Sequence, residues 1–146
     1  MTIEDDFEVA APIERVWVVL KDIPRVAGCI PNATITDIVD PRTFRAKVSV
    51  KVGPVSVGYN ATIVVERLDD ATHEAEFDVK GDELRGRGGV RARVRSTANA
   101  RDGATHVALS ADAQISGIVA TVGGRLIEGI AKKTIAEFAQ NLRGLV

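Results

Sequence analysis

The side chains best suited to chemistry are few and widely separated in this sequence. His73 and His106 are its two histidines, and each lies beside a predicted turn with no cysteine or second histidine at metal-ligand spacing. Cys29 is the only cysteine, has no basic residue next to it, and precedes an Ile-Pro turn. The sequence therefore predicts no metal site, and a small buried cysteine instead of a nucleophile.

A cluster of glycines is the next candidate for chemistry. Gly81, Gly86, Gly88 and Gly89 resemble a loop that cradles phosphate, but they fall between predicted antiparallel strands and no helix begins after them. We expect these glycines to allow sheet curvature and bulges.

Length and charge narrow the class of protein. The chain has 146 residues, enough for one core, and its 19 Lys and Arg against 20 Asp and Glu give a net charge of -1. This balance provides no long-range attraction for nucleic acid, which we exclude as a partner. The N-terminus carries no secretory signal and no apolar run is long enough to span a bilayer, so we expect a cytoplasmic protein.

The hydrophobic pattern predicts one α+β domain over residues 1–146. A strand at Thr2–Val9 precedes a short helix at Pro12–Lys21 and a second short helix or turn at Ile23–Cys29. Strands separated by turn sequences fill Ala33–Gly117, and an amphipathic helix occupies Ile118–Val146. The expected architecture is a curved antiparallel sheet wrapped around a long C-terminal helix.

Two turns fix the register of the predicted sheet. A turn at Gly53-Pro54 places Val48 opposite Tyr59, and a turn at Asp102-Gly103 places Ser96 opposite Leu109. Both pairings extend into one apolar face.

A third turn, near Leu84-Arg85, is expected to place Asp78 opposite Arg91 and Glu76 opposite Arg93. These opposite charges indicate the solvent-facing side of the sheet, where they hold register and keep the surface soluble.

The inward positions of the sheet that we identify carry no group that ionises at neutral pH. Tyr59 and Ser96 are the only polar side chains among them, whereas acid–base catalysis needs a histidine, a carboxylate or a lysine near the substrate. We therefore expect no catalytic residue. Many inward positions are alanine, so the sheet and the helix are expected to leave an apolar cavity. The alternative, a filled core in which these side chains interlock, stays open.

The residues expected to line the cavity and contact a ligand come from the first helix, the strands and the last helix. They are Trp17, Leu20, Val48, Val50, Val57, Tyr59, Phe77, Val90, Val94, Leu109, Val122, Leu126 and Ile130. Gly123, Gly124 and Gly129 are costly in a helix, and a packing or hinge role there would admit the ligand.

Several motifs carry a family resemblance. Phe7-Glu8-Val9 followed by Ala11–Trp17 resembles the opening of START-like (SRPBCC) domains, which have the helix-grip fold also seen in Bet v 1. Cys29-Ile30-Pro31, Lys51–Val55, Ile115-Ser116-Gly117 and Val122–Ile127 together resemble the carbon monoxide dehydrogenase G-subunit (CoxG) family over nearly the whole chain. The chain departs from that pattern at Asn32, where the family commonly has glycine.

The resemblance implies a function. It implies a non-enzymatic accessory protein that recruits a molybdenum hydroxylase of the carbon monoxide dehydrogenase type to the inner face of the cell membrane. It also implies a menaquinone or another prenylated quinone as a non-covalent ligand, with a role in electron transfer and no covalent cofactor. Peripheral membrane contact would use a C-terminal extension that many relatives carry beyond the position of Val146.

Two alternatives remain from the sequence. One is an enzyme similar to the polyketide cyclases of the same superfamily, using Tyr59 with Asp82 or Glu83 at the cavity mouth. The other is a docking module with a filled core that binds a hydroxylase through its last helix.

Overall fold

The N-terminal segment forms one strand and two short helices. The computed structural model describes residues 1–146, beginning with β1 (Thr2–Val9), α1 (Ile13–Leu20) and α2 (Ile23–Gly28). Pro12 caps α1 with an extended backbone, and the Asp22 carboxylate accepts a hydrogen bond from the Arg25 backbone N–H at the start of α2. The predicted helices are therefore present.

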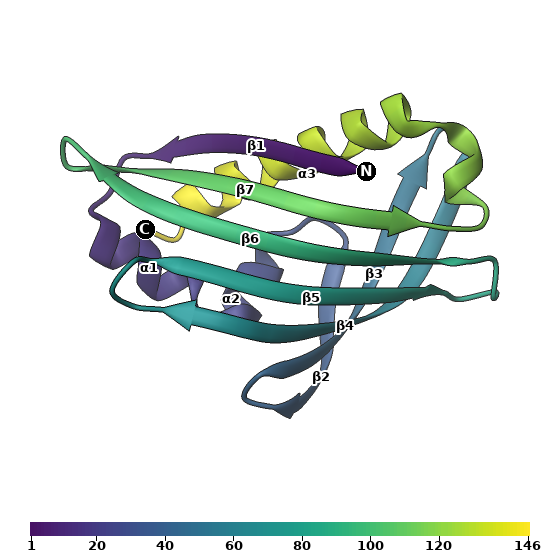
Figure 1. The fold of residues 1–146 in the computed structure, drawn as a ribbon, viewed down its shortest axis with the longest axis horizontal. Coiled ribbons are helices and arrows are strands. Elements are labelled where there is room, and N and C mark those ends of the chain that lie inside the picture. Colours follow the sequence, from purple (N-terminus) through teal and green to yellow (C-terminus); the bar gives the residue numbers. More distant parts are fainter.

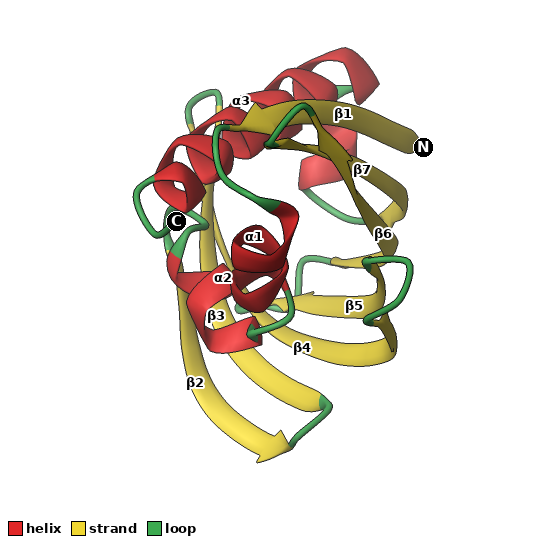
Figure 2. Cartoon of the chain, turned by 90° about the vertical axis from the view of Figure 1, so that its left-hand side faces the viewer, coloured by secondary structure: helices red, strands yellow, loops and turns green.

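Six further strands complete a seven-stranded antiparallel sheet in the order β1-β7-β6-β5-β4-β3-β2. The sheet curves around the helices, with α1 and α2 at one end of its concave side and α3 crossing it (Figures 1 and 2). The strands are β2 (Ala33–Asp40), β3 (Thr43–Val52), β4 (Val55–Asp69), β5 (Glu74–Glu83), β6 (Gly89–Arg101) and β7 (Ala104–Ile115). The helix-grip architecture expected from the sequence is confirmed.

The C-terminal helix is interrupted, contrary to prediction. A 3-10 turn, η1 (Val119–Val122), precedes α3 (Gly124–Arg143), and the two are separated by Gly123 with φ of +94°. This backbone conformation is open to glycine and strained for other residues, so Gly123 ends one helical segment before the next begins. The prediction of one unbroken helix over Ile118–Val146 was wrong in this respect.

The predicted registers are confirmed for two hairpins and wrong for the third. Val48 lies opposite Tyr59 and Ser96 opposite Leu109. In the β5–β6 hairpin, however, Asp78 faces Arg93 and Glu76 faces Arg95, a shift of two residues from the predicted pairs. Residues 84–88 form a longer loop than expected. The shift is even, so every side chain keeps its predicted face.

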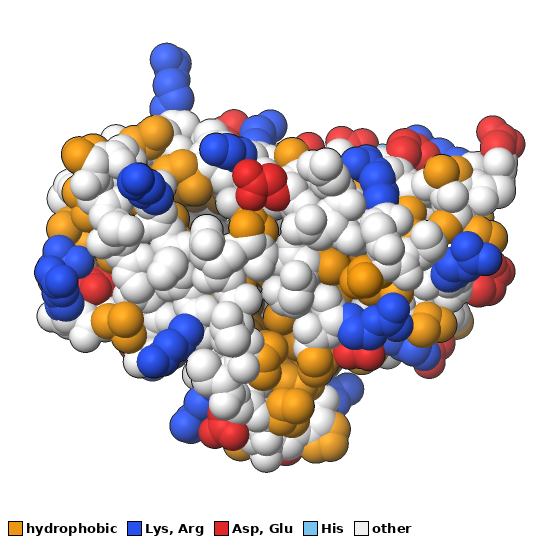
Figure 3. Space-filling view, turned by 180° about the vertical axis from the view of Figure 1, so that it is seen from behind, with side chains coloured by type: hydrophobic (Ala, Val, Ile, Leu, Met, Phe, Trp, Pro, Cys, Tyr) orange, Lys and Arg blue, Asp and Glu red, His pale blue; other side chains and the backbone are white.

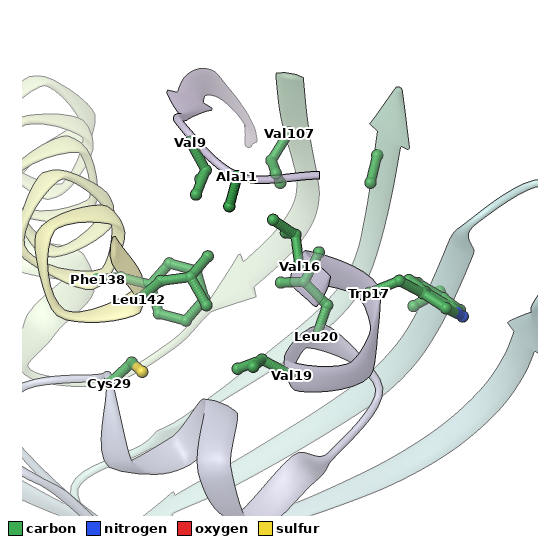
Figure 4. Packing of buried hydrophobic residues seen from close by; sticks show 12 residues of the cluster. Val9, Ala11, Val16, Trp17, Val19, Leu20, Cys29, Val107, Phe138 and Leu142 are labelled. Atoms are coloured by element: carbon green, nitrogen blue, oxygen red, sulfur yellow. The ribbon is translucent and has the colours of Figure 1, made fainter. Parts of the chain in front are cut away.

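The largest core cluster lies under α1 and the end of α3. Val9, Ala11, Val16, Val19 and Leu20 meet Cys29, Phe138 and Leu142, with their side chains pointing toward one another (Figure 4). A second cluster at the opposite end of the sheet gathers Val52, Val57, Tyr59 and Val119. The C-terminal end of α3 thus packs in the first cluster, while η1 and the first turns of α3 pack against the second cluster.

Apolar side chains also reach the surface near the β2–β3 hairpin. Ile38 and Val39 are 58% and 51% exposed, and orange side chains are visible along this protruding lower part of the molecule in Figure 3. No helix of the protein is both long and apolar enough to cross a membrane.

Candidate functional site

An apolar cavity of about 270 Å³ lies between the concave sheet, α2 and α3. Thirteen of its fifteen lining residues are hydrophobic, and none is charged. The lining consists of Leu20, Ile23, Val26, Ala27, Ile30, Ile63, Ala75, Phe77, Val79, Val94, Ser96, Leu109, Thr134, Ile135 and Phe138. The expected cavity is therefore present in the fold.

Strand alternation supplies one wall of the cavity. Phe77 on β5, Val94 on β6 and Leu109 on β7 occupy inward positions, and Phe77 and Val94 are direct partners across the ladder. Phe138 of α3 closes the end nearest the main core, where its ring meets Phe7 edge to face at 6.0 Å between centroids. Non-polar side chains from three strands and from α3 therefore meet in this part of the cavity.

The structure brings four of the predicted ligand-contacting residues to this cavity: Leu20, Phe77, Val94 and Leu109. Trp17 lies elsewhere. Its ring extends away from Phe138 and Leu142 in Figure 4, and its indole N–H donates to the Asp70 carboxylate at 2.7 Å. The helical spacing that groups Trp17 with Leu20 is correct, but adjacent positions on that face meet different neighbours.

Most of the remaining predicted residues lie at the other end of the sheet. Val50, Val57, Tyr59, Val90, Val122 and Ile130 pack in or against the second core cluster. Val48 is half-buried on β3 and is absent from the cavity wall. Leu126 is 43% exposed, in the first turn of α3 after the break at Gly123.

The sequence interpretation missed the contribution of α2. Ile23, Val26 and Ala27 of α2 line the cavity together with Ile30 just beyond the helix, and their spacing of three, four and seven residues is that of one helical face. That signal was available, although the short segment was interpreted only as a helix or turn. On α3, Thr134 and Ile135 also line the cavity beside the predicted helical face.

Two polar side chains face the cavity. The Thr134 hydroxyl donates to the Ile130 carbonyl at 2.9 Å, so its proton is engaged within α3. Ser96 is 5% exposed, and its hydroxyl forms no hydrogen bond with another protein group. The cavity therefore offers one uncommitted hydroxyl and no acid or base.

An ionisable group does occupy the inner face, contrary to the sequence interpretation, but it lies away from the cavity. Glu83 continues the inward positions of β5 and is directly opposite Tyr59 on β4. Its side chain is only 2% exposed and pairs with Arg87 at 2.8 Å. The inward positions predicted from the sequence stop before Glu83, because β5 runs further than predicted.

The Glu83 carboxylate organises the β5–β6 loop. It accepts hydrogen bonds from the Arg87 guanidinium and from the backbone N–H groups of Arg85 and Arg87. The Arg87 hydrogen bond is the main cause that holds the pKa of Glu83 at about 2, although burial opposes it. A carboxylate this acidic and this fully bonded is unsuited to take a proton as a general base at neutral pH.

The neighbouring residues give no other catalytic group. Burial raises the pKa of the Tyr59 phenol, and the charge of Glu83 raises it further while Arg87 lowers it. Burial likewise raises the pKa of the Cys29 thiol, against the effect of Arg25. Both side chains are therefore protonated at neutral pH, and neither lines the cavity.

The two histidines occur singly. His106 Nε2 lies 2.6 Å from an Asp6 carboxylate oxygen on the outer face, and the His73 ring packs edge to face on Trp17 with 5.5 Å between centroids. No group of three or more histidine, cysteine or carboxylate side chains is placed to hold a metal ion.

Comparison with known proteins gives a family and a fold. The family model that describes the G subunit of carbon monoxide dehydrogenase (CoxG) matches residues 6–146. No curated protein matches the chain.

Solved structures share the architecture. A conserved protein from Geobacillus kaustophilus is similar with a TM-score of 0.87 and 23% identity, over 99% of this chain and 93% of that one. A START superfamily protein from Mycobacterium smegmatis has a TM-score of 0.67 and 18% identity, over 98% and 94% of the chains. The Zhui aromatase/cyclase from Streptomyces sp. R1128 has a TM-score of 0.68 and 16% identity, over 99% and 92%. At these identities the likeness establishes the fold alone.

Proposed function

Because the chain belongs to the carbon monoxide dehydrogenase G-subunit (CoxG) family, we propose that it is a non-enzymatic carrier that binds a prenylated quinone, such as menaquinone. The observation that carries this proposal is the apolar cavity of about 270 Å³ with an uncharged wall. A quinone ring is flat, non-polar over its faces and polar only at two carbonyl oxygens. The cavity offers it the matching environment, with apolar contact throughout and a free hydroxyl at one point.

The size of the cavity limits how much of the ligand it holds. Small-molecule sites commonly measure roughly 300–1,000 Å³, so this cavity is near the lower end of that range. It suits a bicyclic ring with a short part of its isoprenoid chain. The rest of a long chain would lie outside the cavity.

We further propose a partner and a location. The family is described as a subunit of carbon monoxide dehydrogenase, and this supports a molybdenum hydroxylase of that type as the partner. In that role it would link the hydroxylase to the membrane quinone pool as an electron-transfer accessory in the cytoplasm. Its contact with the inner face of the membrane would be peripheral.

A cyclase-like activity is less well supported, although one structural neighbour is an aromatase/cyclase. The groups that such an enzyme would use here are Tyr59, Asp82 and Glu83. None of these lines the cavity, and Glu83 is already bonded to three N–H donors. A substrate in the cavity would therefore meet no proton-transfer group.

The test determines whether a quinone copurifies with the protein and whether the protein binds added quinone. Native mass spectrometry with organic extraction is expected to reveal a prenylated quinone at up to one molecule per chain. Added menaquinone with a short side chain is expected to quench the fluorescence of Trp17, the single tryptophan, in a saturable manner. The variant Val94→Phe, which places a ring in the cavity, is expected to lose this response.

Two outcomes would contradict the proposal. One is a protein that carries no quinone and shows no saturable quenching when quinone is added. The other is equal quenching of the wild-type chain and of V94F, since binding would then occur outside the cavity.

A further inference from the structure

Ser96 occupies an unusual position in an otherwise apolar wall. It is 5% exposed, and its direct partners across the sheet are Ala75 on β5 and Leu109 on β7. Neither neighbouring side chain can accept or donate a hydrogen bond. The side chain points inward with the same parity as Val94, and it lines the cavity.

The Ser96 hydroxyl also has room in front of it. Polar side-chain atoms that are fully enclosed in this protein all have hydrogen-bond partners. A free hydroxyl on Ser96 must therefore reach a space that a water molecule can enter. Since Ser96 lines the cavity, that space is the cavity itself.

From this geometry we infer that Ser96 orients the ligand by donating a hydrogen bond to an oxygen at its polar end. This inference rests on the proposed function and specifies it. The ligand class is a largely apolar molecule with a carbonyl oxygen at one end, held at Ser96, and with its apolar surface against residues such as Phe77 and Ile135. A hydrocarbon of the same shape would displace water from the hydroxyl and leave it unpaired.

Tyr59 provides a matched comparison. It is 7% exposed, its hydroxyl has no hydrogen bond within the protein, and its ring belongs to the second core cluster instead of the cavity wall. It is also the only tyrosine in the chain. Substitution of Tyr59 by phenylalanine therefore removes an unpaired inner hydroxyl at the other end of the sheet with little change in shape.

The experiment compares two probes of nearly equal shape, 2-methyl-1,4-naphthoquinone and 2-methylnaphthalene, on the full chain. Ser96→Ala is expected to weaken quinone binding about threefold to tenfold, the usual effect of one neutral hydrogen bond. It should leave the affinity for the hydrocarbon unchanged or raise it, because the variant has no hydroxyl for the hydrocarbon to leave unpaired. Tyr59→Phe should change neither affinity, and thermal unfolding of both variants reports whether they are folded.

The single tyrosine gives a second readout. With ¹³C in the Cζ position of tyrosine, one signal reports on the phenol of Tyr59. This signal is expected to move equally with both probes or with neither, because the quinone oxygen lies at Ser96.

The outcomes separate this inference from the proposed function. If the wild-type protein binds both probes and S96A loses no preference for the quinone, Ser96 is not the anchor and only this inference is overturned. If Y59F loses that preference instead, the ligand is oriented the other way and the inference is again wrong. If the wild-type protein binds neither probe nor short-chain menaquinone, the carrier function itself fails, and the anchor fails with it.

Discussion

Filling the cavity with a larger apolar side chain should stabilise the protein while it prevents ligand binding. Val94 is half-buried at the centre of β6 and lines the cavity, so Val94→Phe directs a ring into empty space. A phenyl group in place of an isopropyl group buries about 40 Å² more apolar surface, which is about 1 kcal/mol at 25 cal/mol per Å². For a chain of this length that gain corresponds to about 3 °C in Tm.

Val90 supplies a matched control on the same strand and face. It is also half-buried, but it packs against the second core cluster and lines no part of the cavity. Val90→Phe therefore has to force a ring among packed side chains, at a cost of about 1–3 kcal/mol. Scanning calorimetry should show Tm rising or unchanged for V94F and falling for V90F.

Equal destabilisation of the two variants would contradict this prediction, because it would mean that the space beside Val94 cannot accept a ring. Urea unfolding followed by Trp17 fluorescence supplies an independent free energy of unfolding, since this side chain is buried in the main core.

Two further predictions concern the β5–β6 loop. A Cβ at Gly117, which has φ of +80°, would overlap the Arg87 carbonyl oxygen, whereas one at Gly103, also at +80°, would meet nothing within 4 Å. Gly117→Ala should therefore cost at least about 2 kcal/mol more free energy of unfolding than Gly103→Ala; similar urea midpoints would contradict this. The folded pKa of Glu83, about 2, is below its ordinary value of 4.5, so its contribution to stability is present above pH 4.5 and lost as the pH falls toward 2. Glu83→Gln should flatten that part of the pH dependence of the urea midpoint, whereas Glu66→Gln, at an exposed position, should not.

Much of the fold follows from local signals in the sequence. The Gly53-Pro54 and Asp102-Gly103 turns are tight, and a tight turn fixes which residues face each other along both strands. The loop after Glu83 is different. In this loop the buried Glu83 carboxylate accepts hydrogen bonds from the backbone N–H groups of Arg85 and Arg87. No local sequence pattern predicts that contact.

The sequence predicted an apolar cavity, but it identified only some of the residues that line it. Alternation along the strands identified Phe77, Val94 and Leu109, because the inward parity of a strand is a local property. Which inward residues meet a cavity and which meet a packed cluster depends on where the helices lie above the sheet. The break between η1 and α3 at Gly123, which has a positive φ, belongs to that placement, and Leu126 is exposed just after it.

The residues of α3 that border the cavity, Thr134, Ile135 and Phe138, lie in the second half of the helix. Within α3 only Phe138, Ala139 and Leu142 are buried, all near its C-terminal end, where Arg143 also donates two hydrogen bonds to the Glu8 carbonyl. The earlier turns of the helix have no fully buried side chain. On the strands, the inner residues Ala92 and Ala111 are half-buried, and neither of them lines the cavity. The cavity wall is apolar surface that a flat hydrophobic ligand can cover, and the absence of charge on that wall favours carriage of the ligand over its chemical conversion.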